Sequence, residues 1–118
     1  MADALARVLV TGSREWADSA RIAEALASAK AYYGSIVVVH GDCPTGADRL
    51  AQEWADSEGV PTERHPADWR AYGKAAGPVR NQEMVDLGAV VCLAFPLGTS
   101  RGTWDCMRRA RRAGIAVI

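Results

Sequence analysis

The stretch Arg7-Val8-Leu9-Val10-Thr11-Gly12-Ser13-Arg14 decides the fold class of this 118-residue chain. Its apolar run is continuous rather than alternating and is rich in β-branched residues, a pattern typical of a parallel strand that helices cover on both faces. Comparable runs recur at residues 35–40, 89–95 and 114–118, with a weaker one at 60–64. The sequence therefore predicts a sheet of five mostly parallel strands.

Helical patterns separate these runs. Asp18 is placed to cap a helix that extends to about residue 32. Thr45, with Asp48 three residues later, has the form of a capping box before a second helix. Residues 78–87 and 103–113 carry two further helical patterns.

Strands and helices that alternate in this way predict an α/β fold, a Rossmann-like three-layer α/β/α sandwich with a mostly parallel five-stranded sheet. The chain length fits one domain, residues 1–118. Residues 66–77 follow neither pattern, and a dozen irregular residues in a small domain often form a functional loop or lid. We therefore expect a single ligand-binding domain with one loop of functional interest.

Charge and composition narrow the classes of function. The 14 basic residues balance 14 acidic residues, so the chain has no overall attraction to a polyanion, and nucleic acid is not an expected partner. No apolar run approaches the roughly 18 residues of a membrane helix, and the first seven residues lack the pattern of a secretory signal. The three cysteines are widely spaced, unlike a disulfide framework. These features predict a cytoplasmic protein without a membrane partner.

Three polar, glycine-rich turns follow the predicted strands, at residues 11–14, 41–48 and 96–103. In open parallel sheets, ligands bind outside the carboxyl ends of the strands, where free backbone N–H groups and helix dipoles suit phosphate. Each turn taken alone is also compatible with an ordinary tight turn. Residues 41–46 have the glycine spacing of a P-loop, but Ala47-Asp48 follow where Lys-Ser/Thr is required, and no G-x-G-x-x-G is present. Three such turns at one edge predict an anionic, nucleotide-like ligand.

Two segments together resemble a known signature. Residues 80–85 (RNQEMV) and 95–103 (FPLGTSRGT) resemble the R-K-x-x-M … P-G-G-x-G-T signature of the LOG proteins, which are cytokinin-activating phosphoribohydrolases. LOG proteins belong to the SLOG superfamily, which also includes the Smf/DprA DNA-processing proteins. Residues 10–14 and 40–48 look most like the YspA-related branch, common in bacteria and their phages. The resemblance implies a Rossmann-like fold with a nucleotide-derived ligand at the strand ends, and a homodimer, which relatives commonly form.

The resemblance also implies roles for single residues. Arg80 matches the arginine that serves the catalytic site of LOG enzymes. Their phosphate-binding turn is matched by Gly98, Gly102 and Thr103. Cys106 stands where the pattern G-T-x-x-E has its glutamate, and Asp105 is the nearby carboxylate. A hydrolase of this kind, cleaving N-glycosidic bonds in nucleotides, would use Arg80 and Asp105 as catalytic residues.

The predicted ligand-binding residues come from the three turns and from the start of one helix. Arg14 is expected to clamp a phosphate. Asp42 and Asp48 are expected to accept hydrogen bonds from ribose or to hold Mg²⁺ that accompanies a nucleotide, with helix capping as the alternative for Asp48. Trp69 and Tyr72 either stack on a base or anchor the irregular loop. The complete set is Gly12, Ser13, Arg14, Gly41, Asp42, Gly46, Asp48, Arg80, Asn81, Gly98, Thr99, Ser100, Gly102 and Thr103.

Arg80 and Asn81 are predicted to begin a helix, where a basic side chain opposes the dipole and so favours a functional role. Histidine and cysteine spacing indicates no metal site. Three functions stay open. The leading one is a module that senses or processes a nucleotide or nucleotide-derived small molecule. The alternatives are a LOG-like phosphoribohydrolase acting on nucleoside monophosphates and a binder of single-stranded nucleic acid, with the basic run 108–112 as its patch.

Overall fold

Four parallel strands form a sheet in the computed structural model, which describes residues 4–118. They are β1 (Ala6–Gly12), β2 (Ile36–His40), β3 (Thr62–Arg64) and β4 (Val91–Phe95), in the order β3-β2-β1-β4. Each of the runs 7–11, 35–40, 60–64 and 89–95 contains or overlaps one of these strands. The predicted α/β, Rossmann-like class with a parallel sheet is confirmed.

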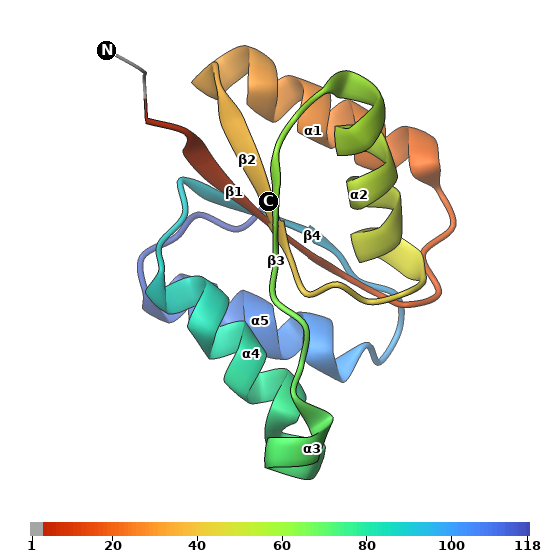
Figure 1. Ribbon diagram of the computed structural model, residues 1–118, viewed down its shortest axis with the longest axis vertical. Helices are drawn as coiled ribbons and strands as arrows, with labels where there is room; N and C mark the ends of the chain where they lie inside the picture. The colour runs from red at the N-terminus through yellow and green to blue at the C-terminus, as the bar shows by residue number, and fades with distance from the viewer. Residues whose placement is uncertain (1–3) are drawn as a thin grey trace.

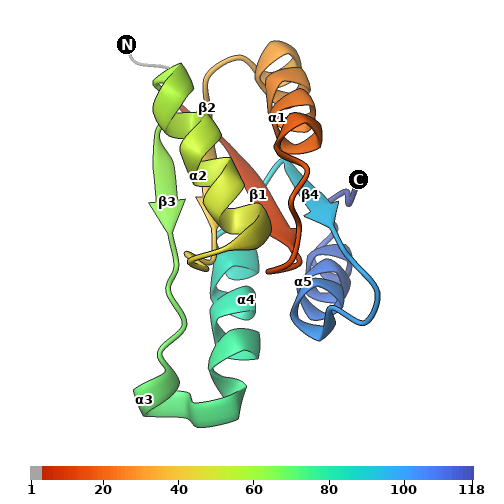
Figure 2. The same ribbon diagram turned by 90° about the vertical axis from the view of Figure 1, so that its right-hand side faces the viewer.

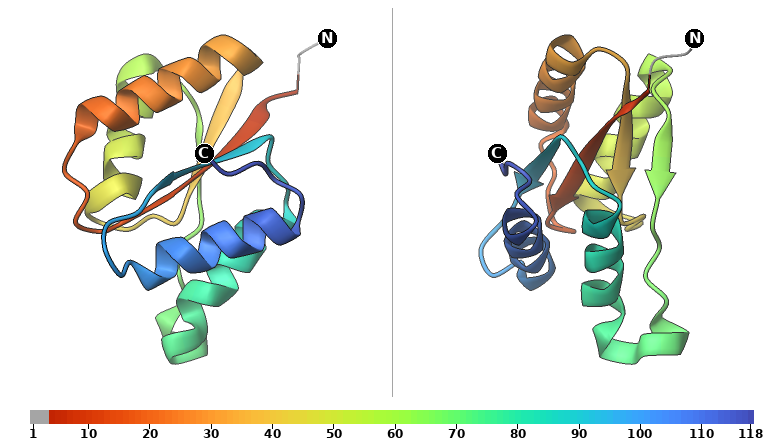
Figure 3. Two further views of the ribbon diagram at one scale, coloured as in Figure 1. Left: turned by 180° about the vertical axis from the view of Figure 1, so that it is seen from behind. Right: turned by 90° about the vertical axis from the view of Figure 1, so that its left-hand side faces the viewer.

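Helices cover both faces of the sheet (Figure 1). One face packs against α1 (Ser19–Tyr33) and α2 (Gly46–Glu58), and the other against α4 (Ala76–Asp86) and α5 (Arg101–Arg112). Successive strand side chains point to opposite faces, so Val8 and Val10 join the first core while Leu9 joins the second. Figure 3 shows the two layers from behind and from the side.

The order of the strands places a switch point beside β1. The chain adds β2 and then β3 on one side of β1, and it returns through α4 to add β4 on the other side. In open α/β sheets, this reversal opens a crevice at the carboxyl ends of the strands. The fold therefore places its crevice where β1 ends at Gly12 and where α5 begins after β4.

The predicted fifth strand, at residues 114–118, is absent from the described chain as a strand. Its backbone lies beside β4 and makes three hydrogen bonds there, among them Cys92 N to Ala116 O at 2.8 Å. Only one residue pair, Cys92 and Val117, forms a bridge. Because α5 runs to Arg112 and the chain still turns at Gly114 (φ 80°), too few residues align with β4 to extend a ladder.

The prediction that residues 66–77 are irregular is wrong. They contain α3 (Trp69–Tyr72), the 3₁₀ helix η1 (Gly73–Ala75) and the start of α4. The signal was Asp68, whose carboxylate accepts a hydrogen bond from Ala71 N at 3.0 Å and caps α3. Figure 2 shows α3 beyond the end of the sheet, at the tip of an arm that leads into α4.

The capping box predicted before α2 is also wrong. Thr45 is the N-cap residue, but its hydroxyl donates to Arg14 O at 3.0 Å, and the Asp48 carboxylate accepts from Cys43 N at 3.3 Å. Both side chains thus tie loops together instead of closing the first turn. Asp18 does cap α1, with its carboxylate 3.0 Å from Arg21 N. Among residues 4–118, no helix is both long and apolar enough to cross a membrane.

Candidate functional site

A cavity of about 390 Å³ opens at the carboxyl ends of β1 and β2, between α4 and the start of α5. Its volume lies in the range of small-molecule sites, roughly 300–1,000 Å³. Ten of the fourteen predicted residues line it: Gly12, Ser13, Arg14, Gly41, Asp48, Arg80, Asn81, Ser100, Gly102 and Thr103. The structure therefore brings together all three turns that sequence reasoning selected.

Four predicted residues are not among those that line the cavity. Asp42 lies against a neighbouring cavity of about 250 Å³, where its carboxylate is 3.8 Å from Arg64 Nη1. Gly46 brings the loops after β1 and β2 into close contact, because a Cβ added there would lie 2.2 Å from Ser13 O. Gly98 and Thr99 are exposed on the loop before α5.

Four basic side chains line the cavity, Arg14, Lys74, Arg80 and Arg101, against one acidic side chain, Asp48. None of the four forms a salt bridge within residues 4–118, whereas six other arginines do: Arg7, Arg21, Arg49, Arg64, Arg108 and Arg109. Positive charges gathered around a cleft raise its electrostatic potential and favour the binding of an anion. Sequence reasoning missed Lys74 and Arg101, although Arg101 lies within the turn at residues 96–103.

The first turn of α5 presents backbone donors to the same cavity. The N–H groups of Arg101, Gly102 and Thr103 have no acceptor in the described chain, and Ser100 makes no side-chain cap. At the start of α2, by contrast, one of the first-turn donors is occupied, because Ala47 N donates to Ser13 O at 3.1 Å. A free helix N-terminus attracts phosphate through its N–H groups and its dipole. The first turn of α5 therefore has all three of these N–H groups free, whereas the first turn of α2 uses one of its own to hold the loop after β1.

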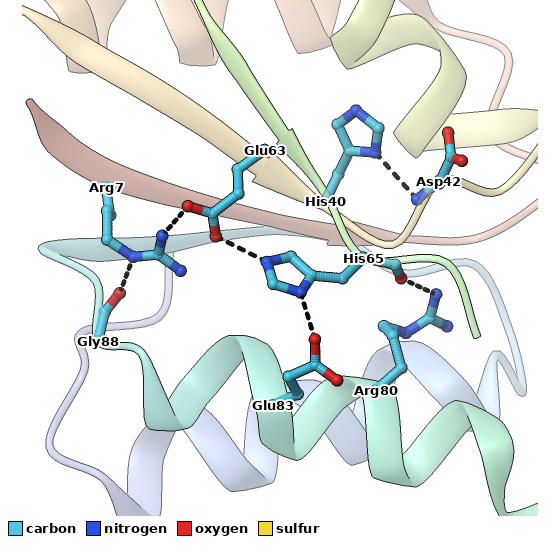
Figure 4. Close-up of polar contacts among 8 residues, drawn as sticks. All are labelled: Arg7, His40, Asp42, Glu63, His65, Arg80, Glu83 and Gly88. Carbon is cyan, nitrogen blue, oxygen red and sulfur yellow. Dashed lines mark hydrogen bonds and ion pairs between the residues drawn. The ribbon is translucent and has the colours of Figure 1, made fainter. Parts of the chain in front are cut away.

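Arg80 is held at the cavity wall by backbone carbonyls. Its Nη1 donates to Gly41 O at 2.6 Å. The same Nη1 donates to His65 O at 3.4 Å (Figure 4). The prediction that Arg80 begins a helix is wrong: α4 begins at Ala76, because the chain is already helical before Pro78. The helix dipole therefore gives no reason to assign Arg80 a functional role. The reason is instead that Arg80 lines the cavity.

Asn81 connects Arg80 to α5. It is buried, its Oδ1 accepts from Arg80 Nε at 3.0 Å, and its Nδ2 donates to Gly102 O at 3.2 Å and to Asp105 Oδ2 at 3.0 Å. Both amide protons are therefore used within the protein. Asn81 acts as a positioning residue for the start of α5.

Asp105 does not line the cavity. Its carboxylate accepts from Asn81 and from Arg109 Nε at 2.8 Å, and Arg108 Nη2 lies 3.8 Å away. Burial raises the pKa of Asp105, but hydrogen bonds from Arg109 and Asn81 outweigh it and hold this pKa below its ordinary value. The carboxylate that does line the cavity is Asp48.

Neither histidine has a free ring nitrogen. His40 Nδ1 accepts from Asp42 N at 3.0 Å, so Nε2 carries the proton and donates to Gln52 Oε1 at 2.7 Å. Within residues 4–118, no group of three or more His, Cys, Asp and Glu is arranged to hold a metal ion. The cavity lining does not fit a protein-held Mg²⁺ site, because one carboxylate stands there among four cations.

His65 belongs to a cluster that ties β1, β3 and α4 together (Figure 4). Its ring nitrogens lie 2.6 Å from Glu63 Oε2 and 2.8 Å from Glu83 Oε1. Arg7 pairs with Glu63 and donates to Gly88 O at 2.7 Å. The hydrogen bond from Arg7 lowers the pKa of the Glu63 carboxyl. The cluster supports β3 and the residue that follows it, His65, whose carbonyl oxygen accepts from Arg80.

The aromatic residues near the site have different surroundings. Trp69 lines the cavity, is 52% exposed and has the Arg14 guanidinium carbon 6.0 Å from its ring centroid. Tyr72, on the same helix, is equally exposed but is not among the lining residues. Trp16 packs edge-on against Phe95, with ring centroids 5.4 Å apart, and so belongs to the core.

A sequence model of the YspA, cpYpsA-related SLOG family matches residues 6–72. The chain belongs to this family. It is also similar to the Gene 61 protein of Mycobacterium phage D29, with 52% identity over 119 residues, covering 95% of this chain and 94% of the relative. The family match spans β1 to α3 and includes the segments that contribute Ser13, Arg14 and Trp69 to the cavity. Membership in a SLOG family indicates a role connected with nucleotide-related ligands.

Proposed function

We propose that residues 1–118 form one domain that senses or processes a nucleotide or nucleotide-derived small molecule, bound in the cavity at the carboxyl ends of β1 and β2. The phosphate of this ligand is bound by the N–H groups of residues 101–103, with Arg14, Lys74, Arg80 and Arg101 around it. Mg²⁺, where it takes part, arrives with the phosphates and is not held by the protein.

One observation carries the proposal: four cations that form no salt bridge within residues 4–118 line one cavity together with the first turn of α5, whose N–H groups have no acceptor there. An unpaired cation normally prefers water, so a cluster of them around a concave surface favours a ligand of opposite charge. Helix N–H groups add directional donors for phosphate oxygens. The zero net charge of the whole chain points to a small anion instead of a long polyanion.

Thermal-shift and calorimetric titrations test this proposal with inorganic phosphate, AMP, ADP, ADP-ribose and cyclic dinucleotides. A ligand at 100 times its Kd adds about 2.7 kcal/mol to the free energy of unfolding, or about 10 °C in Tm for a domain of this size. Arg101→Ala is expected to weaken binding about tenfold, the effect of losing one charge-assisted hydrogen bond. Removing a cation from a helix N-terminus does not destabilise that helix, so the loss would reflect binding.

Arg112→Ala is the matched control. Arg112 is exposed in the last turn of the same helix, away from the cavity, and the substitution removes the same charge. We expect this variant to bind within about twofold of the wild type, below the ~0.5 kcal/mol of an ordinary surface change. No stabilisation by any compound, or equal losses in the two variants, would refute the proposal.

The other functions are less well supported. Cleavage of an N-glycosidic bond needs a carboxylate near the anomeric carbon, and neither Asp42 nor Asp105 lines the cavity. The carboxylate that does line it, Asp48, is buried and accepts a hydrogen bond from Cys43 N. In the basic run 108–112, Arg108 and Arg109 pair with Asp105, which weakens the case for a nucleic-acid patch. A homodimer stays a prediction that the oligomeric state in solution would test.

A further inference from the structure

We infer that Trp69 is a platform for an aromatic base, so that the cavity selects nucleotides over sugar phosphates of the same charge. This inference rests on the proposed function and adds to it the recognition of the base, the part of the ligand that carries no phosphate. Charge alone does not separate AMP from ribose 5-phosphate, because both carry the same phosphate group. The selectivity would come from the indole ring on α3.

Trp69 presents a large aromatic side chain to the cavity. Its ring is half exposed at the cavity wall, although burial in the core would be more favourable. The helix that carries it is only four residues long, is capped by Asp68 and joins α4 through η1. A Cβ added at Gly77 would lie 3.9 Å from the Trp69 ring, so one edge of the indole rests on the first turn of α4. The helices α3 and η1 thus hold the Trp69 ring at the cavity wall and leave the ring half exposed.

Arg14 faces the Trp69 ring across a gap that a small movement of the Arg14 side chain would widen enough for a planar group. Its guanidinium carbon lies 6.0 Å from the ring centroid, at the outer limit of a cation–π contact. A flat ring placed between the two needs about 7 Å, twice a stacking contact of ~3.5 Å. The Arg14 side chain is exposed and makes no side-chain hydrogen bond or salt bridge in the described chain, so a shift of about 1 Å meets little resistance. Arg14 would then cover the other face of the base instead of contacting the phosphate, which Lys74, Arg80 and Arg101 would still surround.

The phosphate donors and the aromatic ring come from different elements around one cavity. The free N–H groups of residues 101–103 belong to α5, whereas Trp69 belongs to α3, and both elements contribute lining residues. A ligand that uses both must carry a phosphate and a planar group on one small framework. A nucleoside monophosphate or diphosphate has this form, and a volume of about 390 Å³ suits one nucleotide.

Calorimetric titrations with inorganic phosphate, ribose 5-phosphate, AMP, GMP, CMP and UMP test the inference. The wild type is expected to bind at least one nucleoside monophosphate about 5- to 150-fold more tightly than ribose 5-phosphate, the range for one base stacked on an aromatic ring. Trp69→Ala is expected to remove this advantage and to leave ribose 5-phosphate binding within about twofold. Trp69→Phe keeps a ring and is expected to retain most of the advantage.

Tyr72→Ala is the matched control. Tyr72 lies three residues further along α3 and has the same 52% exposure, but it is not among the cavity-lining residues, so its variant is expected to behave as the wild type. If Trp69→Ala weakens ribose 5-phosphate and nucleotides equally, Trp69 only anchors the arm and the inference is overturned while the proposed function stands. Equal binding of AMP and ribose 5-phosphate to the wild type overturns it as well. Absence of binding by every phosphate compound overturns the proposed function and the inference together.

Discussion

Gly46 begins α2 and lies directly against the loop that carries Ser13 and Arg14 into the cavity. Its φ is +73°, in the left-handed region, and a Cβ there would lie 2.2 Å from Ser13 O and 2.5 Å from Arg14 Cα. These neighbours are backbone atoms, so no side-chain rotation relieves the overlap. Gly46→Ala therefore requires the loop after β1 to move.

Gly59, at the other end of α2, offers a control that separates the two effects. Its φ is +66°, but a Cβ there would meet nothing within 4 Å. Gly59→Ala carries only the left-handed strain, about 1–2 kcal/mol, less a few tenths from the stiffer unfolded chain. Gly46→Ala carries the same strain plus an overpacking term of about 1–3 kcal/mol, so we expect a total loss of about 2–5 kcal/mol.

Equilibrium urea unfolding, followed by circular dichroism, measures both losses in the free energy of unfolding. The same variants are then titrated with the phosphate compound that binds the wild type. Gly46→Ala is expected to weaken binding, because the displaced loop carries Ser13 and Arg14, whereas Gly59→Ala is expected to leave affinity unchanged. Equal losses of stability in the two variants, or full affinity in Gly46→Ala, would refute the reasoning.

Two further predictions concern side chains around the cavity. Asn81→Ala removes three hydrogen bonds around a buried position, so we expect a loss of about 2 kcal/mol in urea unfolding, and a loss below about 0.5 kcal/mol would contradict its positioning role. The second prediction concerns acid. The pKa values of Glu63 and Asp105 are lowered in the folded state, so each carboxylate contributes stability that is present above its unfolded-state pKa and is lost as the pH falls through its folded-state pKa. Urea midpoints should therefore fall below about pH 4, and less steeply in Asp105→Asn; midpoints that stay level to about pH 3 would show that neither pairing stabilises the fold.

The arrangement of strands and helices was largely predictable because it rests on local patterns. Continuous β-branched runs indicate strands that are buried on both faces of a sheet. Asp18 marks the start of α1, because its carboxylate accepts a hydrogen bond from Arg21 N. Two local interpretations were wrong for tertiary reasons. The Thr45 hydroxyl donates to the backbone of Arg14, which is distant in sequence, instead of capping its own helix. Residues 114–118 form only one bridge with β4, between Val117 and Cys92, and so do not form a strand.

The sequence identified the turns that form the site, but not which side chains line the cavity. The strand-end rule located Ser13, Gly41 and Gly102 without any knowledge of strand order. The sequence does not single out Lys74 as a ligand-binding residue, because Lys74 lies in residues 66–77, where no helical pattern is visible; the structure places it in η1. Asp105 was selected by its place in a motif, yet α5 turns it toward Arg109, away from the cavity.

The sequence by itself determined the α/β class and the glycine-rich, polar character of the strand ends, because both depend on which residues are neighbours along the chain. The tertiary structure alone decided which charges meet. Arg14, Lys74, Arg80 and Arg101 come from four separate segments, and their approach depends on the return of the chain across β1 and on the helical arm at residues 69–75. No local pattern encodes that approach, since it results from the packing of helices on both faces of the sheet. Although the net charge of the chain is zero, the cavity is lined by four basic side chains and one acidic side chain.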